Sequence, residues 1–280
     1  MQWKTVSNVQ RFWEISYVYL LSQESRYAQI ISLIQTIEKK KIDGFCFWVL
    51  LDDKNCLGFA ILNQKGDFDC SYVPPNMIKS LITNIQQTGI SITRITAPST
   101  TTEYFVTDYP DPCTLEMHQY IFECSTVMVP DSDGGRLIQA QQEHKDKVHS
   151  MLLGFLLDCF PDITNRDKIA DRSLQEISAG NIYLWKNNIG EIVSMAAKVR
   201  ETQNTTSISW VYTPKAHRSH GYGSKVTAYL SLLCIQQGKP FCNLLTDASN
   251  PTSNSIYKKI GYKQIGIQSI YQVHPSKTIV

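Results

Sequence analysis

The chain contains 280 residues, which is enough for one large domain or two domains of ordinary size. Apolar residues make up 42% and charged residues 19%, a composition that is typical of a folded globular protein and excludes a disordered or fibrous one. The formal net charge is +2, so charge alone indicates neither nucleic acid nor a membrane surface as a partner.

The first half of the sequence predicts an alternation of helices and strands. Ile30, Leu33, Ile34 and Ile37 fall on one helical face, and the polar residues at 52–55 are typical of a turn between two strands. The expected elements are a helix over 9–40, strands over 45–51 and 57–62, a helix over 77–87, and strands over 90–95 and 114–128.

A polar, turn-rich segment over 129–135 follows, and beyond it the pattern starts again. The expected elements are helices over 148–156 and 167–178, strands over 181–186, 191–200 and 207–212, a helix over 221–237, a strand over 241–247, a helix over 253–260 and a last strand from Tyr262. Both halves show a similar order of elements without obvious sequence identity. We therefore expect two copies of one α/β (α+β) unit, as domains 1–128 and 129–280.

Cysteine and histidine usage bears on the compartment and on metal binding. The eight cysteines form no CxxC pair and most lie in apolar runs, which is typical of buried free thiols in a reducing compartment. The histidines show no metal-ligand spacing. No segment has the roughly 20 apolar residues of a membrane helix, and the first residues do not resemble a signal peptide. The sequence predicts a cytoplasmic protein without a metal.

The clearest chemical signal is a glycine-containing loop that joins strand 207–212 to the helix over 221–237. The loop has the form Arg218-x-x-Gly221-x-Gly223. Glycines let the backbone approach a bound phosphate closely, and the free N–H groups of a first helical turn point at such a ligand. The pattern indicates an anion site that suits a pyrophosphate, although a strand-to-helix turn also uses glycine for structural reasons alone.

A second motif follows strand 241–247. The residues Asn-Pro-Thr-Ser-Asn at 250–254 open a short helix, with Ser253 as a candidate N-cap, and Gly261 ends that helix. Tyr257 lies near its middle.

Together the two motifs resemble those of the GNAT acetyltransferase superfamily. Segment 209–224 is similar to the pyrophosphate-loop motif Arg/Gln-x-x-Gly-x-Gly/Ala after a strand ending in Val-Tyr-Thr-Pro, and segment 250–262 is similar to the element Asn-Pro-x-Ser-Asn-x-x-Tyr-x-x-x-Gly-Tyr. The resemblance covers about residues 128–280. It implies tandem GNAT-like units, each with a central mixed, mostly antiparallel sheet flanked by helices, and it implies acetyl-CoA as co-substrate.

The resemblance also implies roles for matching residues. Val211 and Thr213 would offer backbone groups to the pantetheine arm, Asn250 and Asn254 would face the thiol end, and Tyr257 would protonate the departing thiolate. The full set of cofactor-binding candidates is Val211, Tyr212, Thr213, Arg218, Ser219, His220, Gly221, Tyr222, Gly223, Ser224, Asn250, Ser253 and Asn254.

In this family the amine attacks the thioester directly, without a covalent enzyme intermediate. The backbone N–H of Val211 would polarise the scissile carbonyl. A phenol with a pKa near 10 is protonated at neutral pH, so Tyr257 can act as a general acid; its alternative role is that of a core aromatic residue.

Several residues are left with more than one interpretation. Asp247, Glu201 and Glu123 are candidates for the general base, and the sequence does not choose among them. Trp210 and Tyr212 either line the acceptor pocket or pack in the core. Cys234 and Cys242 lie in apolar stretches and are expected in the core rather than as nucleophiles.

The first half departs from the motif. Where the loop is expected, residues 72–78 read Tyr-Val-Pro-Pro-Asn-Met-Ile, with no Gly-x-Gly and with two prolines that lack N–H groups. This half resembles a degenerate GNAT unit that does not bind CoA.

Three functions are compatible with such a chain: an acetyl-CoA-dependent N-acetyltransferase, a non-catalytic CoA-binding sensor, and an aminoacyl-tRNA-dependent transferase. The near-neutral charge disfavours RNA, and the phosphate cradle favours CoA as donor. We therefore expect an N-acetyltransferase that acts on a small amine or amino-acid-like acceptor, without membrane or nucleic acid partners. An oligomer is compatible with the sequence.

Overall fold

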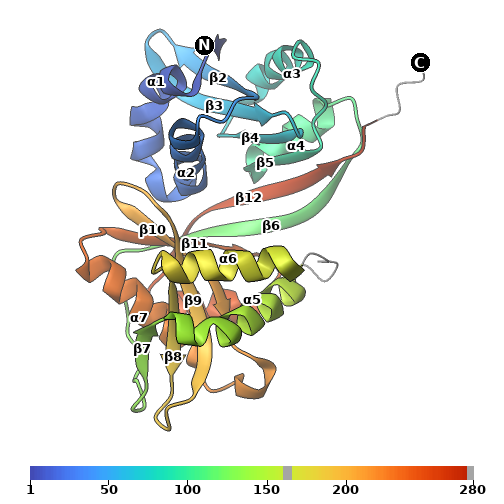
Figure 1. Ribbon diagram of the computed structural model, residues 1–280. Coiled ribbons are helices and arrows are strands. Elements are labelled where there is room, and N and C mark those ends of the chain that lie inside the picture. The colour runs from blue at the N-terminus through green and yellow to red at the C-terminus, as the bar shows by residue number, and fades with distance from the viewer. Residues whose placement is uncertain (160–165, 276–280) are drawn as a thin grey trace. The chain divides into compact units, whose positions relative to one another are not determined.

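The structure is a computed structural model that describes residues 1–159 and 166–275 (Figure 1). The chain forms two compact units. Unit 1 contains Met1–Ile121, Thr246–Asn250 and the residues from Ile265 onward, and unit 2 contains Phe122–Leu245 and Pro251–Gln264. The units are therefore not separated by a single cut in the chain, because two late segments return to unit 1.

The order of helices and strands repeats along the described residues. The first series is β1 (Gln2–Val6), α1 (Val9–Ser22), α2 (Glu24–Lys40), β2 (Phe45–Asp52), β3 (Asn55–Asn63), β4 (Asp67–Cys70), α3 (Ile78–Gln86), β5 (Arg94–Pro98), α4 (Ser99–Asp108) and β6 (Cys113–Cys124). The second series is β7 (Arg136–Gln139), α5 (Lys145–Cys159), α6 (Arg166–Ser178), β8 (Ile182–Lys186), β9 (Ile192–Glu201), β10 (Thr205–Tyr212), α7 (Tyr222–Gln236), β11 (Phe241–Asp247), α8 (Pro251–Lys259) and β12 (Lys263–Val273). The predicted repetition of one α/β unit is confirmed.

Some expected elements differ in detail. The helix expected over 9–40 is two helices, because Gln23 lies outside the helical region with φ −136° and ψ 41°. The strand expected over 90–95 is β5, Arg94–Pro98. The helix expected from Ser253 begins at Pro251, so Ser253 lies within the first turn and is not the N-cap; proline favours this first position because its missing N–H would have no helical partner.

In unit 1 the helices cover both faces of the sheet. The strands are ordered β1-β2-β3-β4-β5-β12-β6, and β12 pairs antiparallel with β5, with Ser269 opposite Ala97. Side chains alternate along a strand, so Phe47 and Val49 of β2 face the cluster that contains α1 and α2. Trp48 faces the opposite cluster, which contains α3 and α4.

Unit 2 is built in the same way. Its strands run in the order β11-β10-β9-β8-β7, with β10 parallel to β11 and the other neighbours antiparallel. Leu184 of β8 and Met195 of β9 face α5 and α6 in one buried cluster. On the opposite face, the ring of Trp185 in β8 lies 4.9 Å from that of Tyr229 in α7. Helix α7, whose first turn carries the predicted anion site, is thus fixed against the sheet.

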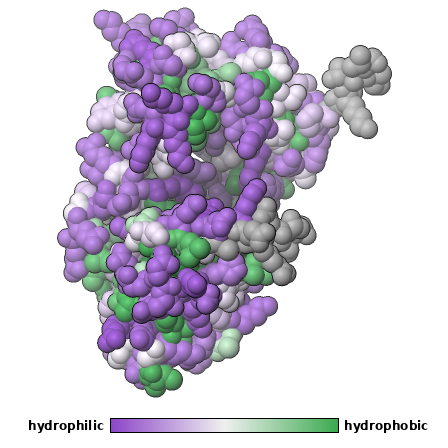
Figure 2. Space-filling model, viewed as in Figure 1, coloured by the Kyte–Doolittle hydropathy of each residue, from purple (hydrophilic) through white to green (hydrophobic). Residues whose placement is uncertain are grey.

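The state of the cysteines and the character of the surface are those of a protein with buried apolar cores. All eight cysteines are free thiols, and Cys234 and Cys242 are buried as expected. The face shown in Figure 2 is largely hydrophilic, with hydrophobic residues scattered over it. Among the helices of the described residues, none combines the length and the apolar character that crossing a bilayer requires.

Gly261 ends α8 at a position where only glycine fits. Its φ is +103°, and a Cβ at this position would overlap the carbonyl oxygen of Thr126. Gly238 has a similar φ, +96°, but a Cβ there would meet nothing within 4 Å. We therefore expect Gly261→Ala to lower the free energy of unfolding by about 1–3 kcal/mol more than Gly238→Ala, since both share the backbone strain and only one adds the overlap. Urea unfolding followed by circular dichroism measures both; equal losses would contradict the tight contact.

Candidate active site

Strand β10 separates from β11 near the middle of unit 2. The parallel pairing between them joins Thr205–Ser207 to Phe241–Asn243 and, among the described residues, goes no further, although β10 continues to Tyr212. A bulge between Ser209 and Tyr212 accompanies this separation, and Trp210 within it has a φ of +52°. A bulge bends and twists its strand. The last residues of β10, including Val211, therefore have backbone groups that β11 does not use.

The loop after β10 leads into the first turn of α7. Gly221 occupies the N-cap position with φ +73°, and Ser219 has φ +67°. No side chain caps this helix end, and its first turn contains no acidic residue. The first N–H groups of a helix have no intrahelical acceptor, and the helix dipole places about half a positive charge there. This end of α7 can therefore receive an anion through its backbone.

The side chain of Arg218 is held by two contacts at the start of the loop. Its Nε donates to the carbonyl oxygen of Thr213 at 3.0 Å, and its Nη2 lies 2.5 Å from a carboxylate oxygen of Asp158. The hydroxyl of Ser194 in β9 donates to the carbonyl oxygen of Tyr212 at 3.1 Å and lies 2.9 Å from the Thr213 hydroxyl. These side chains fix the path of the loop.

The glycines leave room for a ligand between this loop and the helix. At Gly221 a Cβ would meet nothing within 4 Å, so the space above it is open. At Gly223 a Cβ would lie 3.5 Å from the Thr213 hydroxyl and 4.0 Å from Val211, so a larger side chain there would point toward the end of β10. These residues fit a diphosphate on the helix turn with an arm that extends along β10, which is the form of CoA.

The candidates from 211 to 224 are thus brought together in unit 2. The Nδ1 of His220 donates to the carbonyl oxygen of Arg218 at 2.7 Å, and the His220 ring stacks on that of Tyr222 with the ring centroids 5.6 Å apart. Tyr222, Gly223 and Ser224 form the first turn of α7.

The second motif lies partly elsewhere. Ser253, Asn254 and Tyr257 belong to α8 of unit 2, whereas Asn250 belongs to unit 1. Asn254 and Tyr257 are buried. The Tyr257 ring lies 6.2 Å from Phe122 and 6.1 Å from Tyr262. Burial, and secondly the nearby Cys159, raises the pKa of Tyr257 to about 12. The phenol is consequently protonated throughout the neutral range.

The candidates for the general base differ in their surroundings. One carboxylate oxygen of Asp247 accepts from the backbone N–H of Ser249 at 2.8 Å and from its hydroxyl at 2.7 Å. Asp247 therefore has a clear role in the turn after β11. Glu201 ends β9 and Glu123 lies near the end of β6, and no described contact of either carboxylate distinguishes it.

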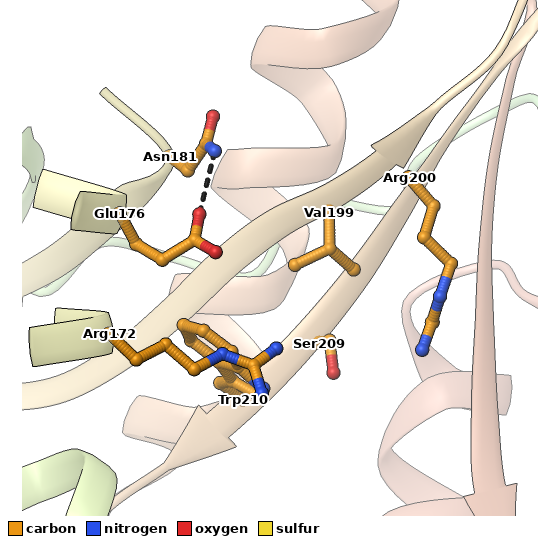
Figure 3. Close-up of a pocket in the computed structure, with 7 residues that line it drawn as sticks. All are labelled: Arg172, Glu176, Asn181, Val199, Arg200, Ser209 and Trp210. Atoms are coloured by element: carbon orange, nitrogen blue, oxygen red, sulfur yellow. Dashed lines mark hydrogen bonds between the residues drawn. The ribbon is translucent and has the colours of Figure 1, made fainter. Parts of the chain in front are cut away.

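A pocket of about 200 Å³ opens beside the β10 bulge (Figure 3). Trp210 lines it and also packs in the buried cluster that contains α5 and α6, so it has both a pocket-lining and a packing role. Tyr212 instead packs against α5, because a Cβ on Gly154 would overlap its ring. The remaining lining residues are Arg172, Glu176, Asn181, Val199, Arg200 and Ser209.

No sequence pattern singles out these other lining residues. They come from α6, the start of β8, β9 and β10, and no short motif joins them. The signal available in the sequence was the pair of positive charges at Arg172 and Arg200, but their proximity depends on the bulges and on how α6 packs.

Comparisons with known proteins agree with this arrangement. Residues 188–271, which include the splayed strand, the loop and α8, match the family model described as FR47-like protein. Solved structures are similar over nearly the whole chain. An acetyltransferase of the GNAT family from Colwellia psychrerythraea is 12% identical with a TM-score of 0.59, covering 98% of this chain and 100% of its own.

Two further structures extend the comparison. A GCN5-related N-acetyltransferase from Sphaerobacter thermophilus is 10% identical with a TM-score of 0.65, covering 98% of this chain and 96% of its own. A tandem GNAT protein from the clavulanic acid biosynthesis pathway is 10% identical with a TM-score of 0.57, covering 99% and 100%. The chain has the tandem GNAT fold. No curated protein matches the sequence.

Because the order of helices and strands repeats, the elements of unit 1 have counterparts in unit 2. In the order of elements, helix α3 of unit 1 corresponds to α7 of unit 2, but it follows Pro74 and Pro75, which have no N–H groups to offer. The backbone N–H of Val73, just before them, already donates to the hydroxyl of Thr101 at 3.0 Å. The turn before α3 thus offers fewer backbone donors at these three positions, and the absence of CoA binding in unit 1 stays a prediction.

Proposed function

We propose that the protein is an acetyl-CoA-dependent N-acetyltransferase that transfers an acetyl group to a small amine. The observation that supports this most is that two features of unit 2 are adjacent in the chain. The end of β10 leaves β11, and the uncapped first turn of α7, with its open glycine, begins immediately beyond it. Backbone donors for a diphosphate and for a carbonyl oxygen thus follow one another along the chain.

Acetyl-CoA would supply an activated thioester. In the proposed site, the N–H groups of Tyr222, Gly223 and Ser224 bind its diphosphate, and the residues at the end of β10 hold its arm. The N–H of Val211 donates to the scissile carbonyl oxygen and stabilises the charge that develops there as the amine attacks.

Tyr257 is proposed to assist the departure of the thiolate by donating a hydrogen bond to it from the phenol. Its raised pKa keeps the phenol protonated, as a donor must be. A phenol with a pKa of about 12 is a weaker acid than a thiol with a pKa near 8.5, so full transfer is unfavourable and its contribution comes mainly from a strong hydrogen bond to the developing charge.

The test is a screen of amines, amino acids and peptides with acetyl-CoA, in which released thiol is detected and the N-acetyl product is identified by mass spectrometry. We expect at least one acceptor to give thiol and product in equal amounts. Calorimetry of acetyl-CoA binding is measured in parallel. Tight binding without turnover of any acceptor would favour a CoA-binding sensor instead, and an absence of binding would overturn the proposal.

A further inference from the structure

The pocket beside the β10 bulge is built on two strained backbone positions. Arg200 is the extra residue at a bulge in β9, where Thr206 pairs with Glu201 and Ser207 with Val199, and it has a φ of +50°. Trp210, at the bulge in β10, has a φ of +52°. Left-handed backbone is strained for a non-glycine residue, and such positions cluster at functional sites. Both residues line this pocket.

The bulge determines where the Arg200 side chain points. In a regular strand alternate residues face opposite sides of the sheet, and a bulge re-aims a side chain. Figure 3 shows the guanidinium groups of Arg172 and Arg200 on either side of Ser209, within the same pocket. Burial lowers the pKa of Arg200, and the nearby positive charge of Arg172 lowers it further.

Neither guanidinium has an acidic partner in the part of the chain that the structure describes. Arg172 lies over the ring of Trp210, 4.6 Å from its centroid, and this stacking orients it. Glu176 is one helical turn from Arg172, but its carboxylate accepts a hydrogen bond from the side chain of Asn181 at 2.8 Å and forms no ion pair with that arginine. Arg172 and Arg200 therefore both line one small pocket, and the Trp210 ring orients the guanidinium of Arg172.

We propose that Arg172 and Arg200 bind the carboxylate of the acceptor, which makes the acceptor an amino acid or another small amine that carries a carboxylate. Arginine matches a carboxylate with paired N–H donors. The volume of about 200 Å³ is several times the roughly 30 Å³ that a water molecule occupies in the liquid. It admits a carboxylate and a short side chain. The carboxylate also offsets the repulsion between the two cations.

That the ligand of this pocket is the acetyl acceptor rests on the proposed function. The test of the pocket itself measures binding and does not need turnover. The probes are the N-acetyl derivatives of the amino acids, which would be the products, and the corresponding N-acetyl amino acid amides, in which a neutral amide replaces the carboxylate. Binding of each probe to the full chain is measured by calorimetry, and acetyl-CoA is titrated separately.

We expect at least one N-acetyl amino acid to bind, and its amide to bind about 10-fold or more weakly, since charged hydrogen bonds are lost. Arg172→Gln and Arg200→Gln should each weaken the acid about 10-fold or more while leaving the affinity for acetyl-CoA unchanged. Arg136→Gln, which removes an exposed arginine of β7 outside the pocket, is the matched control and should have no effect on either ligand.

Melting temperatures of the three variants show whether a loss comes from unfolding, and because Arg172 and Arg200 lie on different elements, one variant remains informative if the other is unstable. Equal binding of acids and amides, no binding by any acid, or unchanged affinity in both pocket variants would overturn the inference. The proposed function fails separately, through the titration with acetyl-CoA.

Discussion

Replacing both Gly221 and Gly223 with leucine is expected to abolish the binding of CoA and acetyl-CoA while unit 2 stays folded. Gly221 is left-handed and borders open space, so leucine there adds strain without a clash and lies where the diphosphate would sit. Leucine at Gly223 extends toward the end of β10. Charge-assisted hydrogen bonds contribute about 1.5–3 kcal/mol each, so the loss of two corresponds to a loss of more than about 100-fold in affinity.

Calorimetry of both ligands measures this loss, and circular dichroism measures folding. The matched control is Gly238→Leu at the opposite end of α7, where φ is +96° and a Cβ would also meet nothing within 4 Å. It introduces comparable backbone strain far from the first turn and should leave affinity unchanged. If the double variant kept its affinity, or if the control lost it equally, the assignment of the diphosphate to this turn would fail.

Tyr257→Phe is expected to lower kcat about 100-fold and to leave the affinity for acetyl-CoA nearly unchanged, because only a hydroxyl is removed. General acid catalysis contributes about 100- to 10,000-fold, and the weak acidity of this buried phenol places the effect at the low end. Steady-state kinetics with the acceptor found in the screen gives kcat, and calorimetry gives the affinity.

Tyr262→Phe provides the control. Tyr262 is also buried, and its hydroxyl lies 2.7 Å from that of Ser231 in α7. Its loss should cost about 1 kcal/mol of stability and little activity. A Tyr257→Phe enzyme with full kcat and a lowered melting temperature would make Tyr257 a packing residue.

The pH dependence gives a second check on Tyr257. The group is active when protonated, and burial moves its deprotonation from near 10 to about 12. Wild-type kcat should therefore not fall on the alkaline side with a pKa near 10. Such a fall, absent from Tyr257→Phe, would show that the donor is a solvated phenol and would contradict the buried geometry.

The glycine loop was predictable from sequence because its chemistry is local. Residues 218–224 carry their own conformational requirement, and the helix that follows has a clear apolar face. The arginine pocket was not predictable, because Arg172 and Arg200 meet only through the packing of α6 and a bulge in β9. A bulge changes pairing by one residue, and periodicity does not reveal it.

The helices and strands likewise divide into those that the sequence predicts and those that it does not. Long elements with regular apolar spacing, such as β10 and α7, were predicted to within a few residues. Helix α4 was missed because Ser99 and three threonines open it, and such residues have low helix propensity. Strands β1, β4 and β7 have five residues or fewer, too short for an alternating pattern to be distinctive.

Because β12 lies beside β5, the sheet of unit 1 can be completed only late in synthesis. Unit 1 begins to form as soon as its first strands leave the ribosome, but one edge of β5 has to wait for residues 268–272, made after all of unit 2. Until then β5 presents unpaired N–H and C=O groups, which can pair with other nascent chains. Loss of the β12 segment would leave that edge open permanently, so a late truncation should cause aggregation through the part of the protein that was synthesised first.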